Sequence, residues 1–270
     1  NKAVLFVTQG VEGVAVYYST ELLVKVGVAL VLGIAMAMMT KVTQQKQIGN
    51  SAGIAKSFYD AIEYSSALSI LIAVGVATVG PQAVYWFLGP SFAKTGDILQ
   101  VLAFVIVVAS WRYSLSLQQM AAERGFRNIS ASVQVGAGVN VVLTVFLVPK
   151  FGVLAAAWAA LIGELVALIL QVILLSRVVD VWQLVRVSWR YIVAGVIALL
   201  GILAVIRSVP GPYPKFSALE AVVGIVIYTI VVYFFSTPVV TTTNTVVMLA
   251  LKRMYNSLIE FIRVVLRIDK

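Results

Sequence analysis

The sequence predicts an all-α protein, a polytopic transmembrane helix bundle of about seven full spans. Composition is the first indication: of 270 residues, 61% are hydrophobic and 11% are charged, whereas about a quarter of the residues in a soluble domain are charged. The second is a mean hydropathy of +1.01 over the whole chain, which leaves too few charged side chains to cover a large soluble domain. The third is the recurrence of apolar stretches of about 20 residues, the length of helix that crosses a bilayer.

The N-terminal segment, residues 3–7, is apolar but too short to span. Because the chain begins with Asn1 where a complete translation product begins with Met, we interpret this segment as the end of a truncated helix. It lacks the order of regions that defines a signal peptide. Stretches of spanning length follow it, and they cover residues 22–40, 61–80, 98–120, 131–148, 153–176, 191–206 and 218–236.

Turn-forming residues separate several of these spans. Residues 149–152 (PKFG) make a very short extracytoplasmic turn, so the two helices beside it must pack as a hairpin. Residues 209–214 (VPGPYP) cannot be helical, because proline lacks the amide donor and restricts the residue before it. Residues 79–97 contain prolines and several aromatic side chains. We interpret them as an interfacial loop with an aromatic belt.

The C-terminal tail, residues 241–270, changes character. Apolar residues recur there at helical spacing, with Lys252, Arg253, Arg263 and Arg267 between them. This pattern is typical of a basic amphipathic helix that lies on the cytoplasmic leaflet and contacts membrane lipids. A loosely ordered tail is the alternative.

Lysine and arginine fall into two sets of loops, and their distribution predicts the orientation because cytoplasmic loops carry the excess. One set holds thirteen basic residues and the other holds four, Lys94, Lys150, Arg207 and Lys215. The thirteen are Lys41, Lys46, Lys56, Arg124, Arg127, Arg177, Arg186, Arg190, Lys252, Arg253, Arg263, Arg267 and Lys270. We therefore expect a multi-pass protein of the cytoplasmic membrane with a cytoplasmic carboxyl terminus.

The absence of two residue types excludes most familiar enzyme chemistry. The chain has no His and no Cys, which excludes Ser-His-Asp and Cys-His catalysis, His-ligated metals, thiolate zinc, haem attachment and disulfides. The net charge of +9 alternates with apolar spans, so it indicates anionic lipid headgroups and orientation signals and not nucleic acid. We expect no cofactor.

Four stretches resemble a known family in their order and spacing. They are residues 14–19 (VAVYYS), 87–102 (FLGPSFAKTGDILQVL), 122–128 (AERGFRN) and, most specifically, 140–164 (NVVLTVFLVPKFGVLAAAWAALIGE). Together they resemble the C-terminal half of polysaccharide biosynthesis proteins, which are oligosaccharide flippases of the multidrug/oligosaccharidyl-lipid/polysaccharide exporter superfamily. The resemblance extends over residues 1–177 and more loosely over the last two spans.

The resemblance implies two similar lobes about a central cavity, with this chain as the second lobe. Residues 1–180 would form the lobe core, which corresponds to the end of helix seven through helix twelve of the family. Residues 181–240 would form two additional transmembrane helices. Residues 241–270 would form the cytoplasmic tail. The implied activity is translocation of a lipid-linked oligosaccharide, a polysaccharide repeat unit, from the inner to the outer leaflet by alternating access. The missing N-terminal lobe would be the partner, and no covalent bond would change.

Three residues near the first span form the sharpest candidate site. Tyr17, Glu21 and Lys25 lie four residues apart, so they share one helical face. A cation in that position could meet an anionic headgroup in the cavity. The alternative is a Glu21–Lys25 pair that lets the helix insert and stays in the protein interior.

The third span carries a second candidate, a polar stripe on an otherwise apolar helix. Arg112, Ser116, Gln119 and Glu123 fall on one face, and such a stripe is expected to line water. Arginine can clamp a phosphate through two parallel hydrogen bonds, which suits a diphosphate-linked lipid. The alternative is an Arg112 side chain that extends toward the cytoplasmic headgroups near Glu123.

Glu164 lies in a helix with small residues at every third or fourth position, where helix backbones can approach closely. It is a candidate for a proton or cation coupling site, or for a structural hydrogen bond to a neighbouring helix. Gln134, Asn140 and Thr144 are expected to form hydrogen bonds between helices, and contact with sugar is the alternative.

Two other functions stay open at this level. The chain could be a membrane enzyme or polymerase of the same glycan pathway, but the longest extracytoplasmic loop is short and carries a single acidic residue, Asp97. It could also be a scaffold, a half-transporter that does not transport.

Overall fold

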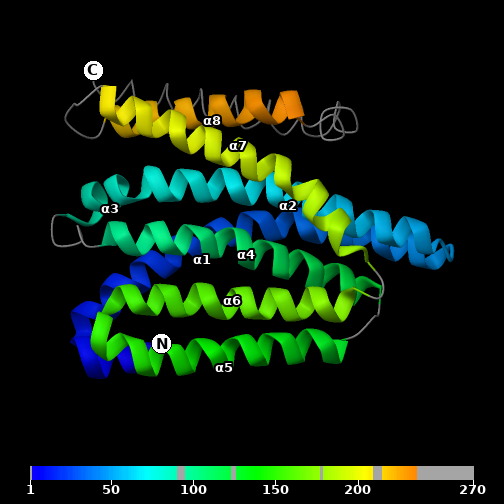
Figure 1. Cartoon of the computed structure of the whole chain (residues 1–270), viewed down its shortest axis with the longest axis horizontal. Helices are drawn as coiled ribbons and strands as arrows, with labels where there is room; N and C mark the ends of the chain where they lie inside the picture. The colour runs from blue at the N-terminus through cyan, green and yellow to red at the C-terminus, as the bar shows by residue number, and fades with distance from the viewer. Residues whose placement is uncertain (1, 90–94, 123–125, 177–178, 209–214, 236–270) are drawn as a thin grey trace, which may run out of the picture. The chain divides into compact units, whose positions relative to one another are not determined.

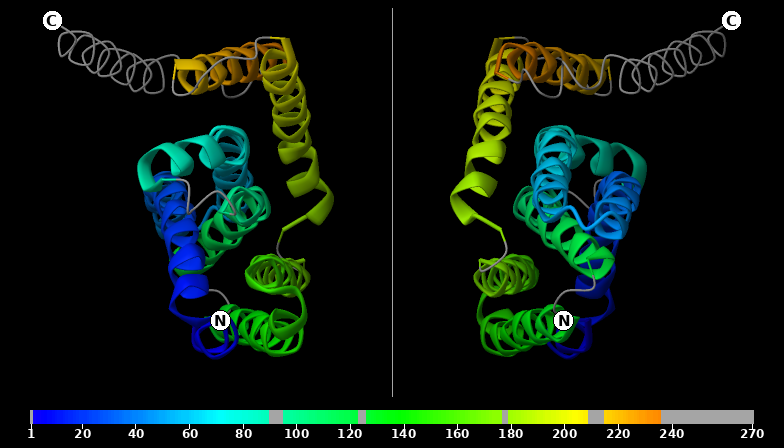
Figure 2. Two further views of the ribbon diagram at one scale, coloured as in Figure 1. Left: turned by 90° about the vertical axis from the view of Figure 1, so that its left-hand side faces the viewer. Right: turned by 90° about the vertical axis from the view of Figure 1, so that its right-hand side faces the viewer.

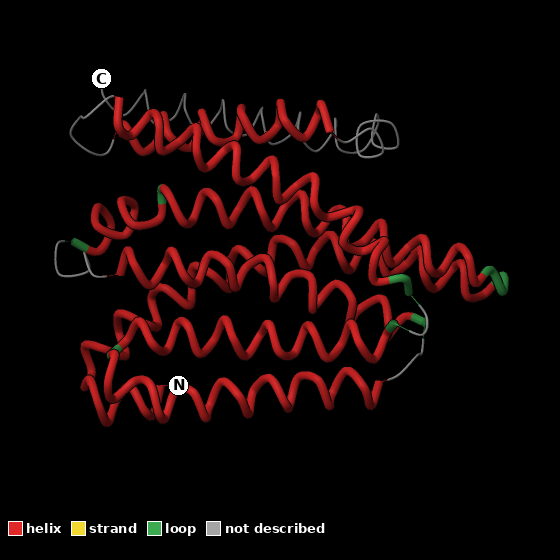
Figure 3. The backbone as a smooth tube through the Cα atoms, viewed as in Figure 1, coloured by secondary structure: helices red, strands yellow, loops and turns green. Residues whose placement is uncertain are grey.

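The computed structural model describes residues 2–89, 95–122, 126–176, 179–208 and 215–235, and every regular element in these ranges is an α-helix (Figures 1 and 3). The helices are α1 (Lys2–Gln47), α2 (Ser51–Thr78), α3 (Gly80–Leu88), α4 (Thr95–Ala121), α5 (Phe126–Phe151), α6 (Val153–Leu175), α7 (Val181–Ser208) and α8 (Lys215–Phe235). The predicted turn at residues 209–214 and the tail at residues 241–270 lie outside the described residues.

Within the described ranges, six helices are long and apolar enough to cross a membrane, α1, α2, α4, α5, α6 and α7. Helix α8 contributes a shorter apolar stretch, Glu220–Phe235. The all-α transmembrane bundle predicted from the sequence is therefore confirmed, and the chain is a multi-pass membrane protein. The compact unit that contains these spans ends at Thr229, within α8, and residues from Ile230 onward belong to a second unit. The division at residue 180 stays a prediction.

Helix α1 is two antiparallel helices joined at Gly10. The backbone there has φ 69° and ψ −167°, which is not helical. The Nζ atom of Lys2 lies 3.0 Å from Glu21, whereas a straight helix would separate residues nineteen positions apart by about 28 Å. Residues 2–9 therefore fold back along the start of the long helix. Leu5 is fully buried in a cluster with Tyr17 and Val148, which fixes the short helix to the bundle.

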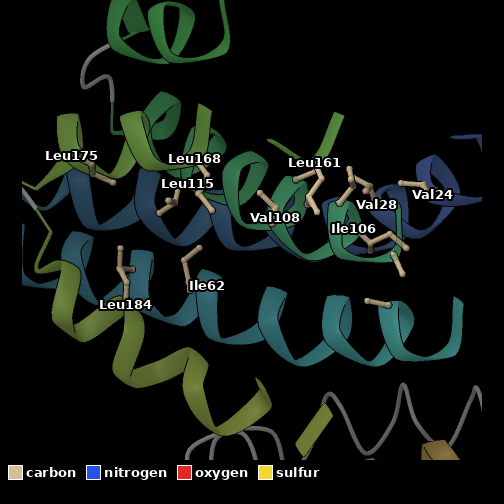
Figure 4. Packing of buried hydrophobic residues seen from close by; sticks show 14 of the residues in the cluster. Val24, Val28, Ile62, Ile106, Val108, Leu115, Leu161, Leu168, Leu175 and Leu184 are labelled. Carbon is tan, nitrogen blue, oxygen red and sulfur yellow. The ribbon is translucent and has the colours of Figure 1, made fainter. Parts of the chain in front are cut away.

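Helix α4 lies at the centre of the spans and packs against α1, α2 and α6. Its apolar residues Leu99, Ile106 and Leu115 are at most 1% exposed. Figure 4 shows Val28 and Leu161, from α1 and α6, in the same core as residues of α4. Because α4 is buried over most of its length, a charged side chain on its buried faces needs a partner on a neighbouring helix.

Helices α5 and α6 form the hairpin that the sequence predicted, and they lie side by side in Figure 2. The reversal occurs at Gly152, whose φ of 68° suits glycine, while α5 continues through Pro149 to Phe151. The turn is therefore shorter than the four residues expected. Gly136 and Gly163 lie in direct contact, since a Cβ on either would collide with the backbone oxygen of the other.

Two predicted loops are wrong. Residues 79–97 contain helix α3, because Pro81 lies in its first turn, where the missing amide costs nothing. The loop expected around residues 41–56 is only a short turn, since α1 runs to Gln47 and α2 begins at Ser51, with the Asn50 side chain accepting a hydrogen bond from the Gly53 amide at 3.0 Å. Hydropathy detects the hydrocarbon-spanning part of a helix and not its polar extensions.

Gly10→Ala is expected to lower the free energy of unfolding by about 1–3 kcal/mol, because this region of backbone conformation is accessible almost only to glycine. Gly33→Ala is the matched control: a Cβ meets nothing within 4 Å at either position, but Gly33 is helical, so alanine is expected to be neutral or stabilising. Equilibrium unfolding in mixed micelles measures both. Equal stability of the two variants would contradict the reversal at Gly10.

Candidate functional site

A cavity of about 390 Å³ lies between α1, α4, α5 and α6. Most of its lining is apolar, and its polar side chains are Tyr17, Glu21, Lys25, Tyr113, Asn140 and Glu164. A largely apolar concave surface with a few convergent polar groups is typical of a ligand site. The cavity brings together predicted site residues from two different spans, α1 and α6.

The α1 side of the cavity carries Tyr17, Glu21 and Lys25 on one face, at the helical spacing seen in the sequence. The Nζ atom of Lys25 lies 2.9 Å from a Glu21 carboxylate oxygen, and the Lys25 side chain is 60% exposed. Glu21 also lies 3.0 Å from Lys2. One carboxylate between two ammonium groups leaves this cluster with a net positive charge.

Lys2 also belongs to this cluster, which its position in the sequence did not indicate. Its Nζ atom also lies 4.4 Å from the centre of the Tyr18 ring, a cation–π contact. The available signals were a lysine in an apolar segment and a glycine, Gly10, at the end of that segment. Because this segment is too short to span a membrane, hydropathy did not indicate that it packs against another helix.

Arg112 is buried, with 5% of its surface exposed, and lies behind the cavity wall. Its Nε and Nη2 atoms donate to the two carboxylate oxygens of Glu164 at 2.6 and 3.3 Å. Glu164 itself lines the cavity and its side chain is 28% exposed. Arg112 therefore holds the Glu164 carboxylate at the cavity surface. The guanidinium group of Arg112 is itself already paired with that carboxylate.

The prediction that the α4 stripe faces water is wrong for Ser116 and Gln119. Both are buried, at 8% and 3% exposed, and both accept hydrogen bonds from the Gln171 amide, at 3.0 and 2.8 Å. Gln171 lies on α6 seven residues after Glu164, hence on the same helical face. The polar stripe on α4 therefore meets a polar stripe on α6. Glu123 lies outside the described residues.

Asn140 of α5 lies beside Glu164 in the cavity wall. A Cβ on Gly163 would come within 2.7 Å of the Asn140 Cβ, so the asparagine packs against the residue that precedes Glu164. Thr144 donates to the Asn140 side chain at 3.2 Å. This bond lies within α5, whereas a bond between two helices was expected from the sequence.

Two apolar cavities lie beside α7. Their volumes are about 460 and 310 Å³, and Trp111 and Ile192 line both of them. Helix α7 is joined to α2 by hydrogen bonds from Tyr191 to Glu63 at 3.0 Å and from Ser66 to Ser188 at 3.2 Å. The space between α7 and helices α4 and α6 is thus apolar, unlike the cavity that Lys25 lines.

Comparison with known proteins identifies the fold. No protein-family model matches the sequence, and no curated protein matches it. Among solved structures, the fold is similar to that of the lipid II flippase MurJ in its inward closed conformation, with a TM-score of 0.69 and 12% sequence identity. The fold is a MurJ-like transmembrane bundle. The similarity covers 83% of this chain and 47% of the MurJ chain, so this chain spans about half the length of that flippase.

Arg112→Met is expected to lower the free energy of unfolding by about 3–5 kcal/mol, because it leaves the Glu164 carboxylate without its partner in a mostly apolar setting. The double variant Arg112→Met with Glu164→Leu is expected to recover most of that loss, since both charges are gone. Unfolding in mixed micelles measures both variants. A single variant as stable as the unmodified protein would show that the pair does not hold α4 to α6.

Proposed function

We propose that this chain forms one lobe of a flippase that moves a lipid-linked oligosaccharide from the inner to the outer leaflet of the cytoplasmic membrane by alternating access. The observation that carries the proposal is a largely exposed ammonium group, that of Lys25, in a cavity between membrane-spanning helices. Charges inside spans are costly and usually face a water-filled pathway or another charge. The MurJ-like fold supports the same reading.

The charge balance of the α1 cluster favours an anionic ligand. Lys2 and Lys25 contact a single carboxylate, Glu21, so one positive charge stays uncompensated within the cluster. A diphosphate that links a lipid to a sugar carries the opposite charge and accepts hydrogen bonds from ammonium groups. In this proposal Lys25 contacts the diphosphate, and Glu21 holds both lysines in place when the cavity is empty.

The apolar cavities beside α7 suit the lipid part of the same ligand. They are lined by side chains such as Trp111, Leu168 and Ile192, which favour a hydrocarbon chain over a polar group. A polyprenyl tail held there would keep the lipid next to the lobe while the polar part occupies the cavity. The second lobe, which closes the cavity in alternating access, belongs to this proposal as a partner.

Lys25→Ala is expected to reduce transport at least tenfold, whereas Lys25→Arg is expected to keep most of it, because positive charge and not the ammonium group itself binds the diphosphate. The assay reconstitutes this chain together with the second lobe in vesicles and measures the movement of a fluorescent lipid-linked saccharide between leaflets.

The double variant Glu21→Gln with Lys25→Ala separates binding from folding. Lys25→Ala alone alters the partners of Glu21, so loss of transport could follow from misfolding. The proposal expects the double variant to be as inactive as Lys25→Ala. Full recovery of transport would mean that the ligand does not require Lys25 itself, and it would contradict the contact proposed here.

The proposed orientation predicts the accessibility of two lysines. Lys46 lies in the last turn of α1 and Lys150 in the last turn of α5. In this Cys-free chain, Lys150→Cys should react with an impermeant thiol reagent in intact cells, and Lys46→Cys should react only after the cells are opened. The reverse labelling would overturn the cytoplasmic placement of the turn between α1 and α2.

A further inference from the structure

The cavity has two chemically different walls. On α1, Lys25 offers a cation. On α5 and α6, Asn140 and Glu164 offer an amide and a carboxylate, and the guanidinium that neutralises the carboxylate is buried behind it. A ligand that spans the cavity would meet an anion-binding group at one side and hydrogen-bonding groups at the other.

The geometry of Glu164 leaves acceptor sites free toward the cavity. A carboxylate has about four lone-pair positions, and Arg112 uses one on each oxygen, through its Nε and Nη2 donors. Arg112 does not line the cavity, while the Glu164 side chain does. The remaining acceptor positions on the two oxygens are therefore available to hydroxyl groups of a ligand.

Asn140 complements this acceptor. It packs against the residue before Glu164, and its side-chain oxygen already accepts a hydrogen bond from Thr144 at 3.2 Å, so its amide group can donate into the cavity. A sugar hydroxyl is both donor and acceptor. It can donate to Glu164 and accept from Asn140 at once.

We propose that Glu164, held in place by Arg112, and the adjacent Asn140 bind hydroxyl groups of the sugar part of the ligand, and that this wall discriminates between saccharides. The inference rests on the proposed function, because it assumes that the diphosphate lies near Lys25. It assigns Arg112 as a positioning residue, which acts through Glu164. A fixed carboxylate rejects a ligand that lacks the matching hydroxyl, since its acceptor would then stay unpaired in the cavity.

The test compares two probes on the protein in lipid nanodiscs, a polyprenyl diphosphate and the same lipid carrying one N-acetylhexosamine. The ratio of their dissociation constants measures the contribution of the sugar. In the unmodified protein the sugar is expected to tighten binding about tenfold or more, as for a hydrogen bond to a charged group. Glu164→Gln, which replaces one carboxylate oxygen by a donor amide, should abolish most of this gain. Because the ratio is taken within each variant, the effect of the lost negative charge on the diphosphate enters both probes equally.

Glu63→Gln is the matched control. It makes the same chemical change in a neighbouring span, at a carboxylate that bonds to Tyr191 outside the cavity, and the sugar contribution should be unaltered. Asn140→Ala keeps the Arg112–Glu164 pair and should lower the sugar contribution several-fold. If Glu164→Gln fails to fold, Asn140→Ala and probes with single hydroxyls removed from the sugar, on the unmodified protein, decide the question.

The outcomes separate the inference from the proposed function. An equal sugar contribution in Glu164→Gln and the unmodified protein overturns the inference, and so does a sugar that adds nothing to binding. If the unmodified protein binds the sugar-free probe and Lys25→Ala weakens it, the proposed function stands in either case. Sugar-free binding that is absent, or that Lys25→Ala leaves unchanged, contradicts the proposed function.

Discussion

Charged side chains inside membrane-spanning helices need partners, because hydrocarbon solvates neither a guanidinium nor a carboxylate. In this protein the Arg112–Glu164 pair meets that need across the interface between α4 and α6. Arg112 is buried in the central helix α4, and Glu164 on α6 lines the cavity. Gln171, bonded to Ser116 and Gln119 on α4, extends the same polar seam along α6. The arrangement of the central helices and the chemistry of one cavity wall thus depend on the same hydrogen bonds.

The opposite wall depends on a backbone feature. The reversal at Gly10 lays residues 2–9 along the start of the long α1 helix and brings Lys2 to Glu21. Without the reversal, Glu21 would have only Lys25 as a cationic partner, and the cluster would be neutral. Because Lys25 is 60% exposed while Glu21 is 26% exposed, the ammonium of Lys25 is the group of this pair that a ligand can reach most easily. Local backbone geometry therefore sets the charge of the proposed anion site.

Sequence patterns predicted the parts of this fold that follow from hydropathy and spacing. The long apolar stretches predicted seven spans, and six of them match helices of spanning length within the described residues, while the seventh matches the shorter apolar stretch of α8. The spacing of Tyr17, Glu21 and Lys25 placed these three residues on one face. The short turn before α6 also predicted the α5–α6 hairpin, but the sequence could not give the polar contacts between helices that are distant along the chain. The stripe on α4 had the pattern of a water-lined face, but polar residues on α6 supply its partners. Helix α3 was missed because a proline in a first turn resembles a loop in sequence.

The resemblance to oligosaccharide flippases and the MurJ-like fold agree on architecture, although one rests on short sequence stretches and the other on backbone shape at 12% identity.

The central claim is that a diphosphate binds at Lys25, and an experimental structure of the protein with a polyprenyl diphosphate tests it most directly. The account predicts a phosphate oxygen within hydrogen-bonding distance of the Lys25 Nζ atom, with the lipid chain leading toward α7. A headgroup bound outside this cavity, with Lys25 still paired only to Glu21, would contradict it.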